Sequence, residues 1–177
     1  GYAIGNWVEI KECIDIMDPE TKNSEQSGDL IEVTLFLAGA MLEAAGKVSS
    51  IEEGILQSRE MLDSGACLKK FIELVEIQGG DVKFIMDTSL YPEAKFKDSI
   101  TSESGGFITK QDALTFGLAA VNLGCGRKTI DDKIDYSSAI ILKRKIGDAV
   151  APGDVICDIT GESAEKVDST KQMLLKG

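Results

Sequence analysis

Apolar residues recur at helical spacing from the start of the chain to about Gly80. A first helix is predicted with Asn6 and Glu9 at the N-cap and N3 positions of a capping box, and Pro19 ends it. Its apolar face consists of Trp7, Ile10, Ile14 and Met17.

Three further helices follow the same pattern. The second is predicted from Asp29 to Gly46, after a polar loop from Glu20 to Ser27, and the third from Ser50 to Gly65. The fourth ends at the paired glycines Gly79-Gly80. The apolar face of the second helix consists of Leu30, Val33, Leu37, Met41 and Ala44. Four short helices need a further surface on which to pack.

The pattern changes after the fourth helix. From Asp81 to Ser104 the periodicity fades, and Pro92 lies in a polar stretch that indicates a connector and a domain boundary. The second half then has an α+β pattern, and residues from about Pro92 onward are expected to form a complete unit. Its predicted elements are a strand at 105–109, a helix at 111–122, strands at 138–146 and 155–160, and a helix at 163–176.

Charge and composition exclude several classes of partner. With 43% hydrophobic and 28% charged residues the chain is typical of a soluble globular protein, without a run long enough to cross a bilayer. A net charge of −11 repels nucleic-acid phosphates and anionic lipid. We therefore expect no nucleic-acid and no membrane partner. The basic cluster Lys143-Arg144-Lys145 is interpreted as the solvated face of a strand.

The residue types that most often carry catalysis are scarce. The chain contains no histidine, which removes the commonest general base. Its four cysteines are scattered and are interpreted as buried free thiols of a reducing, cytoplasmic compartment: Cys13, Cys67, Cys125 and Cys157. The acidic pairs Glu52-Glu53 and Asp131-Asp132 are interpreted as solvated surface. The glycines around Cys125 are interpreted as a helix end rather than a phosphate cradle.

Several separated stretches resemble one enzyme family, in the same order and at similar spacing. Gly1-Tyr2-Ala3-Ile4-Gly5-Asn6 with Glu9 and Glu12 resembles the G-x-A-x-G-N-x-x-E-V-x-E segment of pyrimidine-nucleoside and thymidine phosphorylases. Gln78-Gly79-Gly80-Asp81 is similar to the A-Q-G-G-D of that family. In the second half the matching stretches are Leu123 to Arg127, Ile134-Asp135 and Lys145 to Val150. The departures are Trp7 and Cys125, where the family usually has alanine, and the loop from Glu20 to Ser27.

This resemblance implies a function for the parent protein. Enzymes of the family are pentosyltransferases that split thymidine, uridine or deoxyuridine with inorganic phosphate, giving free base and a pentose 1-phosphate. Residues 1–88 would be the helical part of the family's α/β domain, and residues 89–177 its C-terminal, hammerhead-like α+β domain. The phosphate loop, the base-binding residues and the helical homodimer interface would lie upstream. The fragment is therefore expected to hold no catalytic residues, to bind no organic cofactor and to be inactive alone.

One site of the family is expected to reach into this chain. Some members bind a potassium-like cation beside the phosphate loop, and two of its ligands would correspond to the backbone carbonyl of Ala3 and the carboxylate of Glu12. A hard cation that prefers oxygen donors makes this assignment chemically sensible. The alternative is that Glu12 is an exposed helix residue.

Two other functions are open to this sequence. Residues 147–154 also resemble the turn of biotinyl and lipoyl carrier domains, which present a modifiable lysine. Lys143 and Lys145 are predicted to lie mid-strand without a flanking methionine, which disfavours this alternative. The fragment could also be a stand-alone interaction domain, if its helices expose apolar faces.

Overall fold

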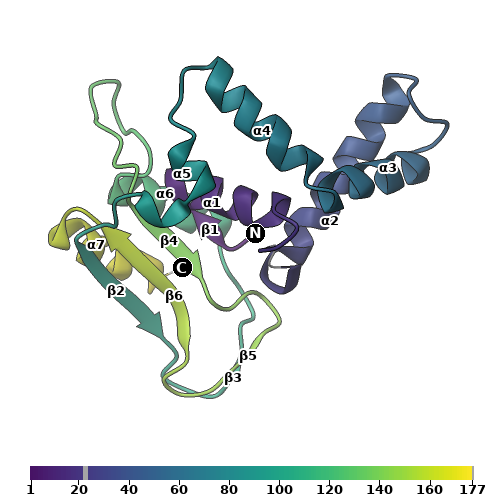
Figure 1. Ribbon diagram of the computed structural model, residues 1–177. Coiled ribbons are helices and arrows are strands. Elements are labelled where there is room, and N and C mark those ends of the chain that lie inside the picture. The colour runs from purple at the N-terminus through teal and green to yellow at the C-terminus, as the bar shows by residue number, and fades with distance from the viewer. Residues whose placement is uncertain (22–23, 177) are drawn as a thin grey trace. The chain divides into compact units, whose positions relative to one another are not determined.

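The computed structural model describes residues 1–21 and 24–176 (Figure 1). The chain divides into two compact units, and each is described by itself. The first comprises Gly1 and Lys11–Tyr91, and the second comprises Tyr2–Ile10 and Pro92–Gly177. Residues 2–10, which the expected boundary at residue 88 assigned to the helical part, pack with the second unit because they supply a strand to its sheet.

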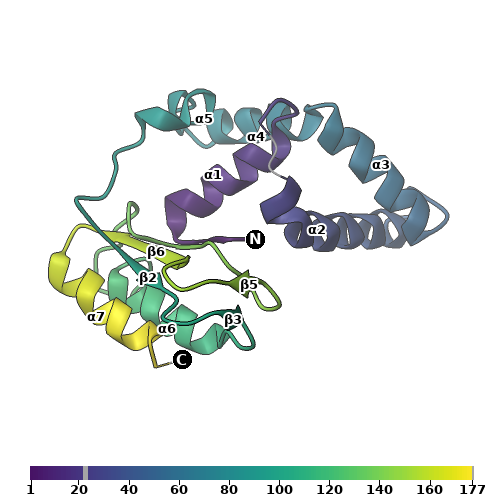
Figure 2. The same ribbon diagram turned by 90° about the horizontal axis from the view of Figure 1, so that it is seen from below.

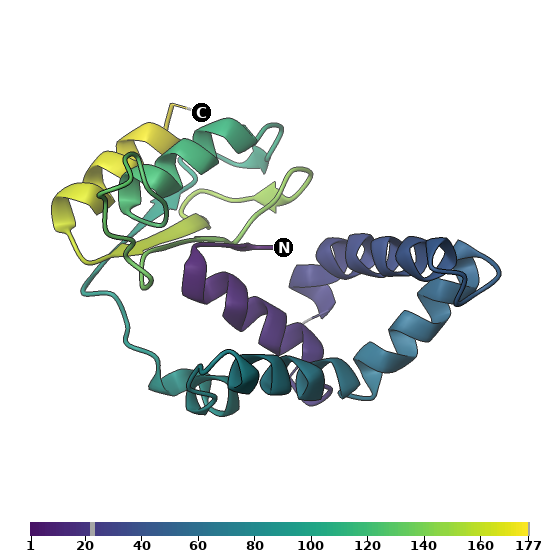
Figure 3. The same ribbon diagram turned by 90° about the horizontal axis from the view of Figure 1, so that it is seen from above.

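The first unit is helical. Helix α1 (Asn6–Met17) enters it at Lys11, and α2 (Ser24–Ala44) and α3 (Ile51–Asp63) lie side by side (Figure 3). The remaining elements are α4 (Ala66–Ile77), α5 (Lys83–Met86) and the 3-10 turn Thr88–Leu90. A small core holds the unit together and consists of Ile16, Ile31, Leu35 and Leu62.

Two helix ends are formed as the sequence predicted. Ser50 has an extended backbone and its side chain accepts a hydrogen bond from the N–H of Glu53, which begins α3. At the end of α4, Gly79 adopts a left-handed φ of 76° and the N–H of Gly80 donates to the carbonyl of Val75 at 2.8 Å. This is the pattern of a Schellman motif.

Helix α2 differs from its prediction in both start and orientation. It begins at Ser24 rather than Asp29, so the expected polar loop is shorter, and Lys22 and Asn23 lie outside the described residues. Ile31 and Leu35 are buried, whereas the predicted buried residues Val33, Leu37 and Met41 are 57%, 54% and 66% exposed. The apolar stripe of α2 is wider than the surface that α3 covers, and packing on α3 selects one edge of it.

Two glycines allow α2 and α3 to approach closely. A Cβ added to Gly54 of α3 would lie 2.6 Å from the Cα of Gly39 in α2, and one added to Gly39 would lie 2.7 Å from the carbonyl oxygen of Ile51. Real side chains do not tolerate such distances to backbone atoms. The pairing of the two helices therefore requires glycine at both positions.

The second unit is a four-stranded antiparallel sheet in the order β1-β4-β6-β2, with two helices on one face (Figures 1 and 2). Its strands are β1 (Ala3–Ile4), β2 (Phe96–Thr101), β4 (Ala139–Leu142) and β6 (Val155–Gly161). The short strands β3 (Gly106–Phe107) and β5 (Ala149–Val150) pair separately. Helices α6 (Ala113–Leu123) and α7 (Ala164–Leu174) lie side by side.

The core of the second unit lies between the sheet and these helices. Ile140 and Ile159 face each other across β4 and β6 and are fully buried, together with Leu123 of α6 and Val167 of α7. The ammonium group of Lys171 bonds both carboxylate oxygens of Asp98, at 2.9 and 2.8 Å, and so ties α7 to β2.

Three predictions about this unit were wrong. The stretch from Asp81 to Ser104, which was predicted to be a connector, contains the whole of β2. Polar and charged residues interrupt the apolar ones in β2 because only one face of this strand is buried, so the pattern did not indicate a strand. Strand β4 ends at Leu142 rather than Ile146, because the N–H groups of Lys143 and Arg144 both donate to the carbonyl of Ile156 and the ladder stops there. Residues from Pro92 onward do not form the complete unit, since β1 comes from the N-terminal segment.

Asp135 joins three segments of the second unit through its carboxylate and its backbone N–H. Its oxygens accept hydrogen bonds from the hydroxyl groups of Ser137 and Ser138, which precede β4, and from the N–H of Glu162, which follows β6. The N–H of Asp135 donates to the carbonyl of Gly124, the residue that ends α6 with φ 117°. Burial, the largest influence on the pKa of Asp135, raises it, but these donors together lower it below its usual range.

We predict that Gly54→Ala will destabilise the helical unit. Alanine normally favours a helix over glycine, but here its methyl group must force the backbones of α2 and α3 apart, at a cost of about 1–3 kcal/mol. Urea denaturation followed by circular dichroism measures the effect. Gly28→Ala, in the partner helix α2 and with open space around its added Cβ, is the matched control and should be neutral or stabilising. Equal stability of the two variants would contradict the close contact.

We predict that Asp135→Ala will destabilise the second unit by about 1–3 kcal/mol at pH 7, because the buried hydroxyl of Ser138 and the donors of Ser137 and Glu162 lose a charged acceptor. A carboxyl whose pKa is lower in the folded state adds stability above its unfolded pKa of about 3.9, and this stability is lost as the pH falls through the folded value. The difference between wild type and variant should therefore shrink below about pH 4.

Denaturation midpoints at several pH values measure this effect. Asp131→Ala, which removes an exposed carboxylate from the same loop, is the control and should change the free energy of unfolding by less than about 0.5 kcal/mol. A difference between wild type and Asp135→Ala that stays constant down to pH 2 would show that the carboxylate charge is not what stabilises the loop.

Candidate functional site

Glu12, one of the two predicted cation ligands, is a buried carboxylate. Its residue is 3% exposed, so the alternative of an exposed helix residue is wrong. The hydroxyl of Ser27, itself 1% exposed, donates a 3.0 Å hydrogen bond to Glu12 Oε1. The backbone at Gly1 also lies close, since a Cβ there would be 2.8 Å from the same oxygen. Burying an ionised carboxylate costs free energy that other groups must compensate, and a glutamate on the surface of a helix does not normally incur this cost.

Ala3, the other predicted ligand, lies in β1 opposite Ile141 of β4. The N–H of Leu142 donates to the carbonyl of Tyr2 at 2.8 Å, which makes Tyr2 and Leu142 a hydrogen-bonded pair. Backbone groups of successive residues in an antiparallel ladder point alternately toward and away from the partner strand. The carbonyl of Ala3 therefore points away from β4, off the edge of the sheet at which β1 lies.

Ala3 belongs to the second unit and Glu12 to the first. Among residues 1–21 and 24–176, no group of three or more histidine, cysteine, aspartate or glutamate side chains could hold a metal ion. A hard cation takes six or more oxygen ligands, so other donors would have to complete any site that Glu12 serves.

A hydrogen bond from Asn6 holds the N-terminal end of α1 in the second unit. The Asn6 side chain does not cap α1 as predicted but donates a 2.7 Å hydrogen bond from Nδ2 to the carbonyl of Cys125. The capping function falls instead to Glu9, whose Oε1 accepts from the N–H of Gly5 at 2.9 Å. A sequence pattern cannot separate these two arrangements, since both place a polar residue before an apolar run.

The turn that receives Asn6 is the predicted helix end. Gly124 ends α6, and the N–H of Cys125 returns to the carbonyl of Ala120 at 3.0 Å. Burial, helped by the charges of Asp135 and Glu9, raises the pKa of the Cys125 thiol to about 12. A thiol that stays protonated at neutral pH is a poor nucleophile, so Cys125 has a packing role.

All four cysteines are free, as predicted, but they are not all buried. Cys157 is buried and Cys67 and Cys125 are partly buried, whereas Cys13 is exposed on α1. Cys13 is exposed although its neighbours Glu12 and Ile14 on this helix are buried, and the sequence pattern did not indicate which face would be covered.

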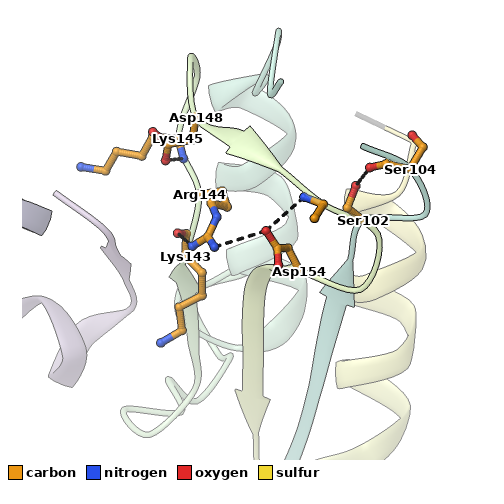
Figure 4. Close-up of polar contacts among 8 residues, drawn as sticks. Ser102, Ser104, Lys143, Arg144, Lys145, Asp148 and Asp154 are labelled. Carbon is orange, nitrogen blue, oxygen red and sulfur yellow. Dashed lines mark hydrogen bonds and ion pairs between the residues drawn. The ribbon is translucent and has the colours of Figure 1, made fainter. Parts of the chain in front are cut away.

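The basic cluster Lys143-Arg144-Lys145 is held in local ion pairs and turns (Figure 4). Arg144 Nη2 lies 3.4 Å from Asp154 Oδ2, which also accepts from the N–H of Ala151 at 3.1 Å. The N–H of Lys145 donates to Asp148 Oδ2 at 2.7 Å and closes the turn before β5. The cluster therefore shapes the turn at 145–148, and its lysines do not lie mid-strand as predicted.

The acidic pairs have structural roles at the surface. The N–H and hydroxyl of Ser49 donate to Glu53 and lower its pKa, and this arrangement fixes the residue before the N-cap of α3 to the first turn of the helix. Asp132 accepts from the N–H groups of Lys128 and Thr129, which orders a turn. These groups are not placed for acid–base catalysis.

Two partners that matter here were not singled out from the sequence. Ser27 lies in the stretch predicted to be a loop, so its contact with Glu12 could not be anticipated. The carboxylate of Asp135 was recognised only as part of a short matching motif, and its role became visible through the hydrogen bonds that it accepts from the segments before β4 and after β6. None of the helices in the described part of the chain has the length and apolar content that a bilayer span requires.

Comparison with known proteins agrees with the order of these motifs. Residues 107–177 match the family model described as pyrimidine nucleoside phosphorylase C-terminal domain. The chain is 36% identical over 174 residues to the pyrimidine-nucleoside phosphorylase of Geobacillus stearothermophilus, covering 98% of this chain and 39% of that protein. It is 35% identical over 154 residues to that of Bacillus subtilis (strain 168), covering 87% of this chain and 34% of that protein.

The chain thus spans 39% or less of the length of these relatives. The part of it that matches the family model contains α6, α7 and the strands β4 and β6 of the sheet, and the segments that Asp135 joins lie in the same region. Over residues 107–177 the chain is thus similar to the pyrimidine nucleoside phosphorylase C-terminal domain family.

Proposed function

We propose that the full-length protein phosphorolyses pyrimidine nucleosides, giving a free base and a pentose 1-phosphate. The observation that carries this proposal is the similarity to pyrimidine-nucleoside phosphorylases along 98% of the chain. Thymidine, uridine and deoxyuridine are the expected substrates, and inorganic phosphate is the expected second substrate. The residues that bind them would lie in the part of the protein that this chain does not include.

The helical unit fits a role as part of a larger domain. Helix α2 exposes Val33, Phe36, Leu37 and Met41, each more than half exposed to solvent. An apolar stripe of this size on a single helix is typical of a surface that another part of the protein covers. We propose that the remainder of the family's α/β domain covers it, and that the full-length protein is a homodimer through a region outside this chain.

The buried carboxylate of Glu12 supports the expected cation site. A hard cation such as potassium would offset the cost of burying this charge, and Ser27 would hold the carboxylate in orientation. The carbonyl of Ala3 is the other oxygen that the family resemblance assigns. When bound, the cation would neutralise negative charge beside the phosphate substrate, while Glu12 itself would bind the metal rather than the nucleoside.

The cytoplasm is the proposed compartment, since all four cysteines are free thiols and such thiols persist in a reducing environment. The exposed stripe of α2 meets the condition for a stand-alone interaction domain, but covering by the rest of an α/β domain accounts for it as well, and no observation favours a carrier. Lys145 begins a tight turn instead of standing at the tip of a hairpin between methionines, so its setting does not match a biotinyl or lipoyl carrier.

We predict that the full-length protein will release thymine or uracil only when phosphate is present, whereas the 177-residue chain alone will not. Liquid chromatography of reactions with thymidine, uridine and deoxyuridine, with and without phosphate, measures this directly. Omission of phosphate is the control for hydrolysis. Phosphate-independent release, or no release by the full-length protein, would contradict the proposed activity.

For the cation, we predict that Glu12→Ala in the full-length protein will raise the potassium concentration needed for half-maximal activity and the KM for phosphate, while the preference among nucleosides stays unchanged. The reason is that the variant removes a charged oxygen donor from the cation. Glu32→Ala, which removes an exposed carboxylate from α2, is the control. If both variants keep the wild-type potassium dependence, Glu12 is not a ligand.

A further inference from the structure

The segment Tyr2–Trp7 is held by the second unit at successive points along its length. Leu142 bonds the carbonyl of Tyr2 at 2.8 Å, and Ala3 and Ile4 pair with Ile141 and Ile140. The N–H of Trp7 then donates to the carbonyl of Tyr136 at 3.4 Å. This segment lies far in sequence from β4 and yet forms the outer strand of its sheet.

Gly5 shows how closely this segment docks. A Cβ at this position would lie 2.5 Å from the carbonyl oxygen of Ser138, and the φ of Gly5 is 141°, a conformation that residues with side chains rarely adopt. The backbone of the segment therefore touches the start of β4 without an intervening side chain, and a small displacement would lose this contact.

Asn6 supplies the side-chain contact of this docking. Its Nδ2 donates to the carbonyl of Cys125 at 2.7 Å, and that carbonyl belongs to a turn that further hydrogen bonds hold in place. Cys125 bonds Ala120 through its N–H and the carbonyl of Ser138 through its Sγ, at 3.2 Å, and the preceding carbonyl of Gly124 accepts from Asp135. Asn6 is also the first residue of α1, the helix that carries Glu12.

We propose that Asn6 is a positioning residue, which fixes the Tyr2–Asn6 segment and the head of α1 on the C-terminal domain. This proposal rests on the proposed phosphorylase function and adds a reason for the C-terminal domain: it holds a segment that serves the active site without touching the substrate. The carbonyl of Ala3 keeps its orientation because the ladder on one side and Asn6 on the other prevent the strand from turning. Loss of the Asn6 contact would loosen that strand.

The first arm of the test is hydrogen exchange in the 177-residue chain with Asn6→Asp, an isosteric change that replaces the donor with an oxygen facing the carbonyl of Cys125. The amides of Trp7 and Leu142 should exchange about tenfold faster or more, because one hydrogen bond and its geometry are lost. Amides in β6 should keep their wild-type rates. Asn6→Ala removes the donor without adding charge, and covers the case in which the aspartate variant does not fold.

The second arm is steady-state kinetics of the full-length protein carrying the same changes. We expect the KM for phosphate and the potassium requirement to rise several-fold with kcat for saturating substrates less affected, and Asn6→Gln, which keeps the amide donor, to recover part of the loss. Asn122→Ala is the matched control, because it removes side-chain bonds from α6 to Ser169 and Thr170 of α7 without touching the segment. This control should leave the KM for phosphate and the potassium requirement unchanged.

Each outcome decides the proposal. Unchanged exchange at Trp7 and Leu142 in both Asn6→Asp and Asn6→Ala would overturn the anchor, and faster exchange with unchanged kinetics would overturn its role in positioning. Equal kinetic losses in Asn122→Ala would show that the Asn6 variants act through a general loss of stability and not through positioning of the segment. A wild-type protein without phosphorolysis would refute the proposed function separately, and the exchange arm would then decide alone whether Asn6 positions the segment.

Discussion

The carboxylate of Asp135 is the interaction on which the second unit depends. It accepts hydrogen bonds from Ser137, Ser138 and Glu162, and the backbone of the same residue bonds Gly124. These contacts bring the end of α6, the start of β4 and the exit of β6 together at one point. Because α7 begins directly after Glu162, its packing on the sheet also follows from this cluster.

The position of β4 in turn determines what the N-terminal segment can do. Once the Gly124–Ser138 loop is ordered, the outer edge of β4 and the carbonyl of Cys125 form a fixed receptor for Tyr2–Asn6. Helix α1 then leaves the second unit and enters the first at Lys11. The C-terminal domain is therefore a discontinuous unit. The strand that completes it, β1, leads directly into α1, the helix that bears the buried Glu12.

Local chemistry made much of this structure predictable. Ser50 acts through its side chain on the backbone three residues away, Gly79 and Gly124 act through their own backbone, and the helix ends at these residues are where the sequence placed them. The buried residues Val167 and Leu174 of α7 were likewise predictable from their spacing.

What the sequence could not reveal depends on distant partners. Which edge of α2 is buried is decided by α3 through Gly39 and Gly54, and the pattern of α2 alone favoured the other edge. Strand β2 carries too many charged residues to look buried, although Asp98 has its partner in Lys171. Asn6 has the residue type of a helix cap, and only the approach of Cys125 explains its hydrogen bond. The family resemblance implies catalytic residues that would lie outside the chain, so the candidate site was limited to Ala3 and Glu12.

Hydrogen exchange on the unmodified chain shows whether residues 2–10 fold as part of the second unit. The amides of Trp7 and Leu142, whose acceptors are Tyr136 and Tyr2, should be protected to a degree close to that of Ile159 in the central strand β6. Exchange of both amides at the rate of a frayed terminus, with Ile159 still protected, would contradict the account.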